Sequence, residues 1–267
     1  MDVPRVVLIT GASTGIGKAC AEYLGEKGYR VYGTSRRSPE SPTPARAFTM
    51  IRMDVTDTAS VQRGMDLIME REGRIDAVFN NAGTHVVGPI EDISIEEAET
   101  NVQTNFFGAL RVCKAVIPLM RAAGRGCIIN MSSVGGVLSL PFQGIYGAGK
   151  FALEGMTEAL RVEVRHFGIR VSLIEPGDIR TQDCRSLSFK TAAYEPWFSN
   201  AVKLYEKDEQ KGYPPERIGP LVTRIIESRN PKLRYSFGRT FQSLVPFLKK
   251  VTPQRLAQWL FCLMYKT

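Results

Sequence analysis

The chain has 267 residues, of which 43% are hydrophobic and 23% are charged, a composition typical of a globular protein. No apolar run approaches the roughly 18 residues that a membrane span needs, and the N-terminus lacks a secretory signal, so we expect a cytoplasmic protein. The five cysteines are scattered and odd in number, and neither His85 nor His166 has a partner at metal-binding spacing, so neither a disulfide framework nor a metal site is expected.

The formal net charge of +8 is concentrated near the C-terminus. Residues 201–267 contain 13 of the 35 Lys and Arg residues but only 5 of the 27 Asp and Glu residues, which leaves 22 of each for residues 1–200. A solvated basic face, contact with an anionic membrane surface, and contact with an acidic carrier or substrate all remain open. No nucleic-acid-binding motif accompanies the charge, so we expect no nucleic-acid partner.

Short apolar runs alternate with helical stretches along the first 180 residues. The runs lie at 5–10, 30–35, 48–54, 75–80, 127–132 and 169–175, and helical stretches lie at 16–27 and 58–70. Strands that are buried on both faces have this continuous apolar character, and alternation with helices favours right-handed βαβ units. The pattern therefore predicts a single α/β domain over residues 1–240, with a Rossmann-type, doubly wound parallel sheet of about seven strands flanked by helices.

The remaining segments are less regular. Residues 38–45 are rich in proline and serine and predict a surface loop, and residues 233–237 predict a last strand. Thr252 and Pro253 suit the start of a final helix, whose apolar stripe consists of Leu256, Trp259, Leu260, Leu263 and Met264. We expect residues 241–267 to form an amphipathic extension that packs on the domain or on a partner. Peripheral contact with a membrane is the alternative.

A glycine-rich segment directly follows the first predicted strand. Residues 10–17, Thr-Gly-Ala-Ser-Thr-Gly-Ile-Gly, open the first predicted helix and have the spacing Gly-x-x-x-Gly-x-Gly. Glycines allow a tight turn and close approach of the backbone to a pyrophosphate, and the helix N-terminus supplies N–H groups and partial positive charge. The segment predicts a dinucleotide site formed around Gly11, Gly15 and Gly17.

The end of the second predicted strand indicates which dinucleotide is bound. An NAD site usually has a carboxylate there to accept the ribose 2′-OH, whereas this chain has Arg36 and Arg37. A guanidinium matches a 2′-phosphate through paired, charge-assisted hydrogen bonds. We therefore predict NADP(H) as the cofactor.

Tyr146 and Lys150 are spaced i and i+4, which puts both on one face of a helix. A nearby ammonium favours tyrosinate, so the pair predicts a lowered pKa for Tyr146 and a role in proton transfer to a carbonyl oxygen. Ser133 follows the fifth predicted strand, 13 residues earlier, and can hydrogen-bond the same oxygen.

Further motifs accompany these residues. The full set is Thr10 to Gly17, Asp54-Val55, Asn80-Asn81-Ala82-Gly83, Asn105-Phe106-Phe107-Gly108, Ser133, Tyr146 to Lys150, and Pro176-Gly177-Asp178-Ile179-Arg180-Thr181. With these motifs the sequence resembles the short-chain dehydrogenase/reductase family over residues 3–240, and within it the hydroxysteroid and retinol dehydrogenase branch. The resemblance implies an oxidoreductase that moves a hydride between nicotinamide and a carbonyl or secondary alcohol, as a homodimer or homotetramer.

The resemblance also implies roles for matching positions. Tyr146 would be the acid/base, Lys150 would bind the nicotinamide ribose, Ser133 would polarise the carbonyl, and Asn105 would position a water. Asp54 and Val55 would contact the adenine, Asn80, Ala82 and Gly83 the adenosine ribose, and Ile179 and Thr181 the carboxamide. The implied cofactor-binding residues are Gly11, Ser13, Thr14, Gly15, Ile16, Gly17, Arg36, Arg37, Asp54, Val55, Asn80, Ala82, Gly83, Tyr146, Lys150, Pro176, Gly177, Ile179 and Thr181.

A substrate lid is implied at about 182–212, where aromatic residues are frequent. We predict an apolar small molecule or carrier-bound carbonyl compound, contacted by Ser133, Leu138, Phe142, Tyr146 and Trp197. A steroid, a retinoid, and a fatty or polyketide acyl chain all suit this description, and the physiological direction stays open. A non-catalytic NADP-sensing regulator, and an epimerase or dehydratase of the family's extended branch, are the competing functions. A regulator should have lost part of the set Asn105, Ser133, Tyr146 and Lys150, which this chain keeps. An epimerase or dehydratase usually has a different glycine spacing and a larger C-terminal domain.

Overall fold

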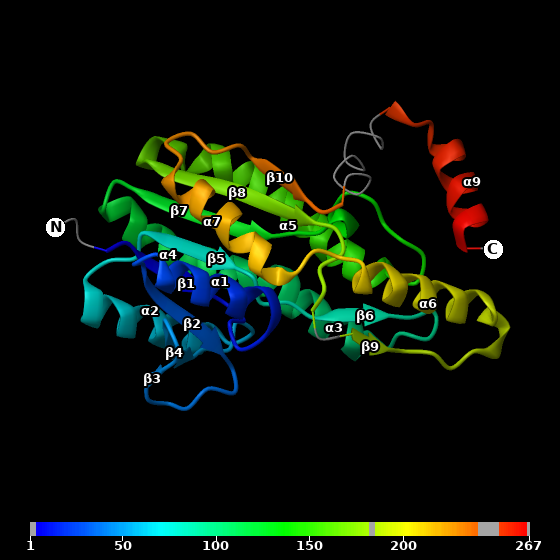
Figure 1. Cartoon of the computed structure of the whole chain (residues 1–267), viewed down its shortest axis with the longest axis horizontal. Helices are drawn as coiled ribbons and strands as arrows, with labels where there is room; N and C mark the ends of the chain where they lie inside the picture. Colours follow the sequence, from blue (N-terminus) through cyan, green and yellow to red (C-terminus); the bar gives the residue numbers. More distant parts are fainter. Residues whose placement is uncertain (1–3, 182–184, 240–250, 266–267) are drawn as a thin grey trace.

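A computed structural model describes residues 4–181, 185–239 and 251–265, and an eight-stranded sheet forms its centre (Figure 1). The strand order is β10-β8-β7-β5-β1-β2-β4-β3, and every pair is parallel except β3 with β4. The strands are β1 (Val6–Ile9), β2 (Arg30–Ser35), β3 (Thr43–Pro44), β4 (Thr49–Arg52), β5 (Ala77–Asn80), β7 (Gly126–Met131), β8 (Ile169–Pro176) and β10 (Arg234–Phe237). The predicted Rossmann-type sheet is confirmed, and the predicted surface loop 38–45 also contributes the short edge strand β3.

Helices cover both faces of this sheet (Figure 1). Successive side chains of a strand point to opposite faces, so Val6 and Leu8 pack in one core while Val7 and Ile9 pack in another. Helices α2 (Thr58–Glu72), α4 (Ala109–Ala122) and α5 (Gly144–Glu163) bury residues in the first core. Helices α1 (Gly15–Glu26) and α7 (Ile218–Glu227) bury residues in the second core.

The chain reverses its direction of winding at β1, which pairs with β2 on one side and with β5 on the other. In open α/β sheets, ligands bind outside the carboxyl ends of the strands at such a point. The loops that follow β1, β5 and β7 therefore surround the expected binding crevice. Helix α3 (Ile95–Val102) and the π-helical turn η1 (Gln103–Gly108) complete the chain between β5 and α4.

The structure also contains a second, two-stranded parallel sheet, which the sequence did not predict. Strand β6 (His85–Val87) pairs with β9 (Arg185–Leu187), about 100 residues later in the chain, with His85 opposite Arg185. Helix α6 (Trp197–Gln210) follows β9, and Figure 1 shows β6, β9 and α6 together at one end of the molecule. We call residues 185–212 the lid segment; residues 182–184 of the expected lid lie outside the described residues.

The last described helix, α9 (Gln254–Tyr265), lies beyond α6 at the same end of the molecule (Figure 1). Four residues of the predicted apolar stripe, Leu256, Trp259, Leu260 and Leu263, are each about half exposed. The described part of the chain therefore leaves this stripe largely uncovered, and the nearby Lys249 and Lys250 lie outside the described residues. None of the described helices combines the length and hydropathy required to cross a membrane.

A row of buried polar side chains links the sheet to helix α5. The Asn80 Nδ2 atom donates to Asn130 Oδ1 at 2.8 Å, and the Asn130 Nδ2 atom donates to Thr157 Oγ1 at 2.9 Å. The Thr157 hydroxyl in turn donates to the backbone carbonyl of Leu153 at 2.6 Å. Because buried amides are costly to leave without hydrogen bonds, this row sets how β5, β7 and α5 lie against one another.

We expect Asn130→Ala to lower the free energy of unfolding by about 1–3 kcal/mol, because it leaves buried groups of Asn80 and Thr157 without their partner. The measurement is urea unfolding followed by circular dichroism. Val162→Ala is the matched control on α5: its side chain is 74% exposed, so the change should be within about 0.5 kcal/mol. Equal stability of the two variants would contradict the prediction.

Candidate active site

The loop between β1 and α1 requires glycine at three positions. Gly11 and Gly15 have positive φ angles of 68° and 56°, a region that side-chain-bearing residues rarely adopt. A Cβ at position 11 would lie 2.8 Å from the Cα of Ala82, and one at position 17 would collide with the backbone carbonyl of Gly11. The loop therefore brings the backbone close to the start of α1, with Ser13 and Thr14 exposed and Ile16 half-buried.

The loop after β5 holds the glycine-rich loop in place. The Asn81 Nδ2 atom donates to the backbone carbonyls of Thr10 and Gly11 at 3.0 and 3.1 Å, and the Ala82 N–H donates to Thr10 Oγ1 at 3.0 Å. Asn81 thus braces the two loops. The Asn80 side chain points instead into the core, where its Nδ2 atom donates to Asn130 Oδ1.

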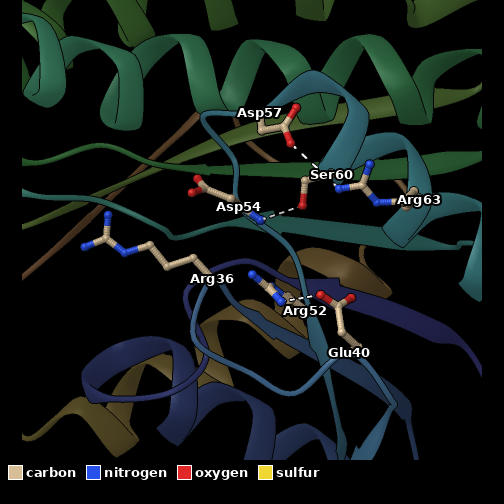
Figure 2. Close-up of a pocket in the computed structure, with 7 residues that line it drawn as sticks. All are labelled: Arg36, Glu40, Arg52, Asp54, Asp57, Ser60 and Arg63. Atoms are coloured by element: carbon tan, nitrogen blue, oxygen red, sulfur yellow. Dashed lines mark hydrogen bonds and ion pairs between the residues drawn. The ribbon is translucent and has the colours of Figure 1, made fainter.

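A cavity of about 230 Å³ lies where β2 and β4 end and α2 begins (Figure 2). Arg52 forms an ion pair with Glu40, and Arg63 lies 3.7 Å from Asp57. The third arginine of the lining is Arg36, and among the described residues no carboxylate forms an ion pair with it. Asp54 accepts hydrogen bonds from the N–H and hydroxyl of Thr56 at 2.9 and 2.8 Å.

Two predicted neighbours of this cavity lie just outside its lining. Arg37 is exposed, and its backbone N–H donates to Ser35 Oγ at 3.2 Å. Val55 is buried against the turn η1, where a Cβ at position 108 would lie 2.8 Å from its Cγ2 atom. The cavity therefore combines Arg36 and Asp54 from the predicted cofactor-binding residues.

Helix α5 carries Tyr146 and Lys150 beside the loop after β7. The Lys150 Nζ atom donates to the backbone carbonyl of Met131 at 2.8 Å and lies 5.7 Å from the centre of the Tyr146 ring. Ser133 follows β7, where its hydroxyl accepts a 3.0 Å hydrogen bond from the Gly135 N–H and also hydrogen-bonds the Tyr146 side chain. The predicted trio of Ser133, Tyr146 and Lys150 is thus brought together.

Asn105 lies on the π-helical turn η1 and faces the same place. Its Nδ2 atom donates to the Thr84 carbonyl at 2.8 Å and to Asn101 Oδ1 at 3.0 Å, while its Oδ1 atom accepts from the Thr84 N–H at 3.0 Å. A Cβ at position 83 would lie 2.8 Å from Asn105 Oδ1 and 3.9 Å from Lys150 Nζ. The absence of a side chain at Gly83 therefore lets Asn105 and Lys150 converge.

Burial shifts the pKa values of both groups on α5. It lowers the pKa of Lys150 from 10.5 to about 8, although the nearby Glu154 carboxylate favours the ammonium. Burial also raises the pKa of Tyr146; the hydrogen bond from Ser133 opposes this shift, and the charge of Glu209 adds to it. The predicted lowering of the Tyr146 pKa is therefore wrong for this structure, because burial penalises tyrosinate.

The sequence reasoning missed three residues around Tyr146. The His85 ring lies against the Tyr146 ring, with 4.1 Å between centroids, and His85 is opposite Arg185 in the β6–β9 sheet. Arg185 forms an ion pair with Glu209 of α6. Only the position of His85, just after the Asn80 to Gly83 motif, offered a signal, since the β6–β9 pairing joins distant parts of the chain.

The segment after β8 closes the crevice on the other side. The Gly177 N–H donates to the Phe237 carbonyl at 2.7 Å, and Ile179 is buried in an isolated parallel bridge with Tyr213. A Cβ at position 15 would lie 3.5 Å from Thr181 Cγ2. Thr181 therefore lies against Gly15 at the N-terminus of α1, whereas Ile179 packs in the core.

Aromatic side chains pack beneath the lid segment. Phe198 lies 5.3 Å from Phe142 and stacks on Phe189 at 4.6 Å, in a cluster with Val87 and Tyr205. Phe142 has a positive φ of 58°, which is unusual for an aromatic residue, and its carbonyl accepts from the Gly88 N–H at 2.8 Å.

The other predicted substrate contacts lie at the border of this aromatic cluster. Leu138 is half-buried, and Trp197 is 39% exposed at the start of α6. Of the predicted substrate contacts Leu138, Phe142 and Trp197, Phe142 is the one that packs in the aromatic cluster.

The chain is similar to known oxidoreductases along nearly its whole length. The pattern that defines the family described as short chain dehydrogenase matches residues 5–190. A 3-ketodihydrosphingosine reductase of Bacteroides thetaiotaomicron is 41% identical over 98% of both chains. Retinol dehydrogenase 8 of Bos taurus is 32% identical over 94% of this chain and 87% of its own.

Solved structures agree with this similarity. A short-chain dehydrogenase from Streptomyces avermitilis superposes with a TM-score of 0.84 at 30% identity and covers 97% of both chains. The structure of ElxO with NADP bound superposes with a TM-score of 0.72 at 25% identity, over 88% of this chain and 97% of its own.

We expect one lysine to titrate with a midpoint near pH 8, because burial favours the loss of a proton from Lys150. Nuclear magnetic resonance of chains labelled at lysine Cε measures this midpoint, and the signal should be absent in Lys150→Met. In Glu154→Gln the midpoint should fall further, because the carboxylate that favours the ammonium is gone. Glu158→Gln, one turn farther along α5, serves as the control. A midpoint above pH 10 for Lys150 would contradict the prediction.

Proposed function

Because this chain belongs to the short-chain dehydrogenase/reductase family, we propose that it uses NADPH to reduce a ketone on a long-chain lipid. Enzymes of this family interconvert CH–OH and C=O groups with NAD(H) or NADP(H). The preference for the phosphorylated cofactor, the lipid substrate and the roles of individual residues are our proposals. The observation that carries them is the convergence of Asn105, Ser133, Tyr146 and Lys150 beside a glycine-formed nucleotide cradle.

The residues present fit a nicotinamide dinucleotide. Gly11, Gly15 and Gly17 form a turn in which added side chains would be strained or would collide, and this turn leads into the N–H groups of α1. Arg36 lines a cavity beside the cradle and would hold the 2′-phosphate, while Thr181 faces Gly15 at the opposite end. When bound, the reduced nicotinamide supplies the hydride to the carbonyl carbon.

The side chains around Tyr146 would complete the reaction. Ser133 and Tyr146 would hold the carbonyl oxygen, and the protonated Tyr146 hydroxyl would donate its proton to that oxygen as the alkoxide forms. The Lys150 ammonium, held by Met131, would stabilise the resulting tyrosinate. Asn105 keeps the Thr84 backbone and the Gly83 turn in place around Lys150.

The proposed substrate resembles 3-ketodihydrosphingosine, a long alkyl chain whose ketone is next to an amine-bearing carbon. The support is the 41% identity to a reductase of that name over 98% of this chain. Phe142 and Phe189, the half-buried aromatic residues packed against the core of Val87, Phe198 and Tyr205, would offer apolar contacts that suit a long hydrocarbon chain better than a small polar carbonyl compound.

Turnover of 3-ketodihydrosphingosine, followed by NADPH absorbance, is the direct test. We expect the wild-type protein to oxidise NADPH and Tyr146→Phe to lose at least about 100-fold in kcat, because the proton donor is gone. Binding of NADPH, measured by fluorescence, should persist in the variant as a control for folding. Undiminished turnover by Tyr146→Phe would exclude the proposed mechanism, and no wild-type turnover would exclude the proposed substrate.

The cofactor preference is tested at Arg36. We expect Arg36→Gln to raise the KM for NADPH about ten- to 100-fold and to change the KM for NADH little, since a charge-assisted hydrogen bond contributes about 1.5–3 kcal/mol. Arg46→Gln is the control, because Arg46 forms an exposed ion pair with Glu26 and does not line the cavity. If both cofactors were affected equally, Arg36 would not be the group that reads the 2′-phosphate.

A further inference from the structure

The lid segment brings a pair of opposite charges beside Tyr146. The β6–β9 register puts Arg185 opposite His85, and the His85 ring lies 4.1 Å from the Tyr146 ring. Arg185 forms an ion pair with Glu209, in the last turn of α6. Both charges thus belong to the lid segment, and His85 of β6 links them to the residue that we propose donates the proton.

The accessible member of this ion pair is the carboxylate. The Arg185 side chain is only 3% exposed, whereas the Glu209 side chain is 30% exposed. Burying a guanidinium is costly unless a carboxylate compensates it, so Arg185 holds Glu209 in place while leaving part of it open to a ligand. The negative charge of Glu209 also acts on Tyr146, whose pKa it helps to raise.

The backbone near Glu209 is joined to the segment that follows β8. The Gly212 N–H donates to the Glu209 carbonyl at 2.8 Å, and a Cβ at position 212 would lie 2.5 Å from the Asp178 carbonyl oxygen. The Tyr213 N–H donates to the same Asp178 carbonyl at 3.2 Å. The end of α6 that carries Glu209 is therefore packed against the proposed nicotinamide-binding segment.

We propose that Glu209, positioned by Arg185, binds the ammonium group that a substrate carries on the carbon next to its ketone. The inference rests on the proposed reduction of a long-chain amino ketone, and it assigns a specificity-determining residue to that reaction. A carbonyl held by Ser133 and Tyr146 would have its neighbouring carbon close to the Tyr146 ring, which is linked to Glu209 through His85 and Arg185. A partly exposed carboxylate there favours a cation over a neutral group of similar size.

The competing interpretation is that the Arg185–Glu209 pair only fastens α6 to β9 within the lid segment. A fastening role affects every substrate alike, since it acts through the shape of the cavity. Recognition of a cation affects the amino ketone far more than a ketone without nitrogen. The two roles therefore differ in the ratio of kcat/KM for two substrates, whatever happens to the absolute rates.

The experiment compares three ketones with wild type, Glu209→Gln and Glu206→Gln. The ketones are 3-ketodihydrosphingosine, its uncharged N-acetyl derivative, and 1-hydroxyoctadecan-3-one, which has no nitrogen. Glu206 lies on the exposed side of α6 and provides the matched loss of one carboxylate. Thermal melting of each variant reports on folding, and NADPH absorbance reports on turnover.

We expect wild type to prefer the ammonium-bearing ketone, and Glu209→Gln to reduce that preference about ten- to 100-fold relative to the ketone without nitrogen. Glu206→Gln should retain the wild-type ratio. An unchanged ratio in Glu209→Gln would overturn the inference while leaving the proposed function intact. No wild-type turnover of 3-ketodihydrosphingosine would overturn both. A loss in Glu209→Gln that is equal on all three ketones would assign the ion pair to the lid structure.

Discussion

The buried ammonium of Lys150 is the interaction on which the rest of the candidate site depends. Its hydrogen bond to the Met131 carbonyl joins α5 to the end of β7, and its place beside Tyr146 sets the charge near the expected carbonyl oxygen. A buried ammonium is costly, and burial accordingly lowers the pKa of Lys150. The loops around Lys150 have to supply hydrogen-bond acceptors for its ammonium group and have to pack closely enough against it to exclude water.

That close approach depends on missing side chains. Gly83 allows Asn105 and Lys150 to lie on either side of the loop after β5, and Gly11 lets Ala82 lie directly against the glycine-rich loop. The buried row from Asn80 through Asn130 to Thr157 then sets the position of α5 relative to the sheet. The nucleotide cradle and the proposed proton donor are thus parts of one packed unit, because both depend on the carboxyl ends of β1, β5 and β7.

The lid segment adds two features to the site, an aromatic cluster and an ion pair. Aromatic packing around Phe198 forms an apolar wall, and the Arg185–Glu209 pair adds charge next to Tyr146. An apolar chain ending in a polar, charged head would meet both features at once. The lid is therefore the part of the structure in which the proposed selection between lipid ketones would take place.

The sequence by itself determined the architecture and most of the site. Buried parallel strands are continuous apolar runs, so the six predicted runs located β1, β2, β4, β5, β7 and β8, and the motifs located Ser133 after β7 and Tyr146 and Lys150 on the next helix. Only the tertiary structure decided the direction of the Tyr146 pKa shift, because burial outweighs the effects that spacing indicates. Only the tertiary structure brought His85, Arg185 and Glu209 together, since β6 and β9 pair across about 100 residues and no local pattern records that contact.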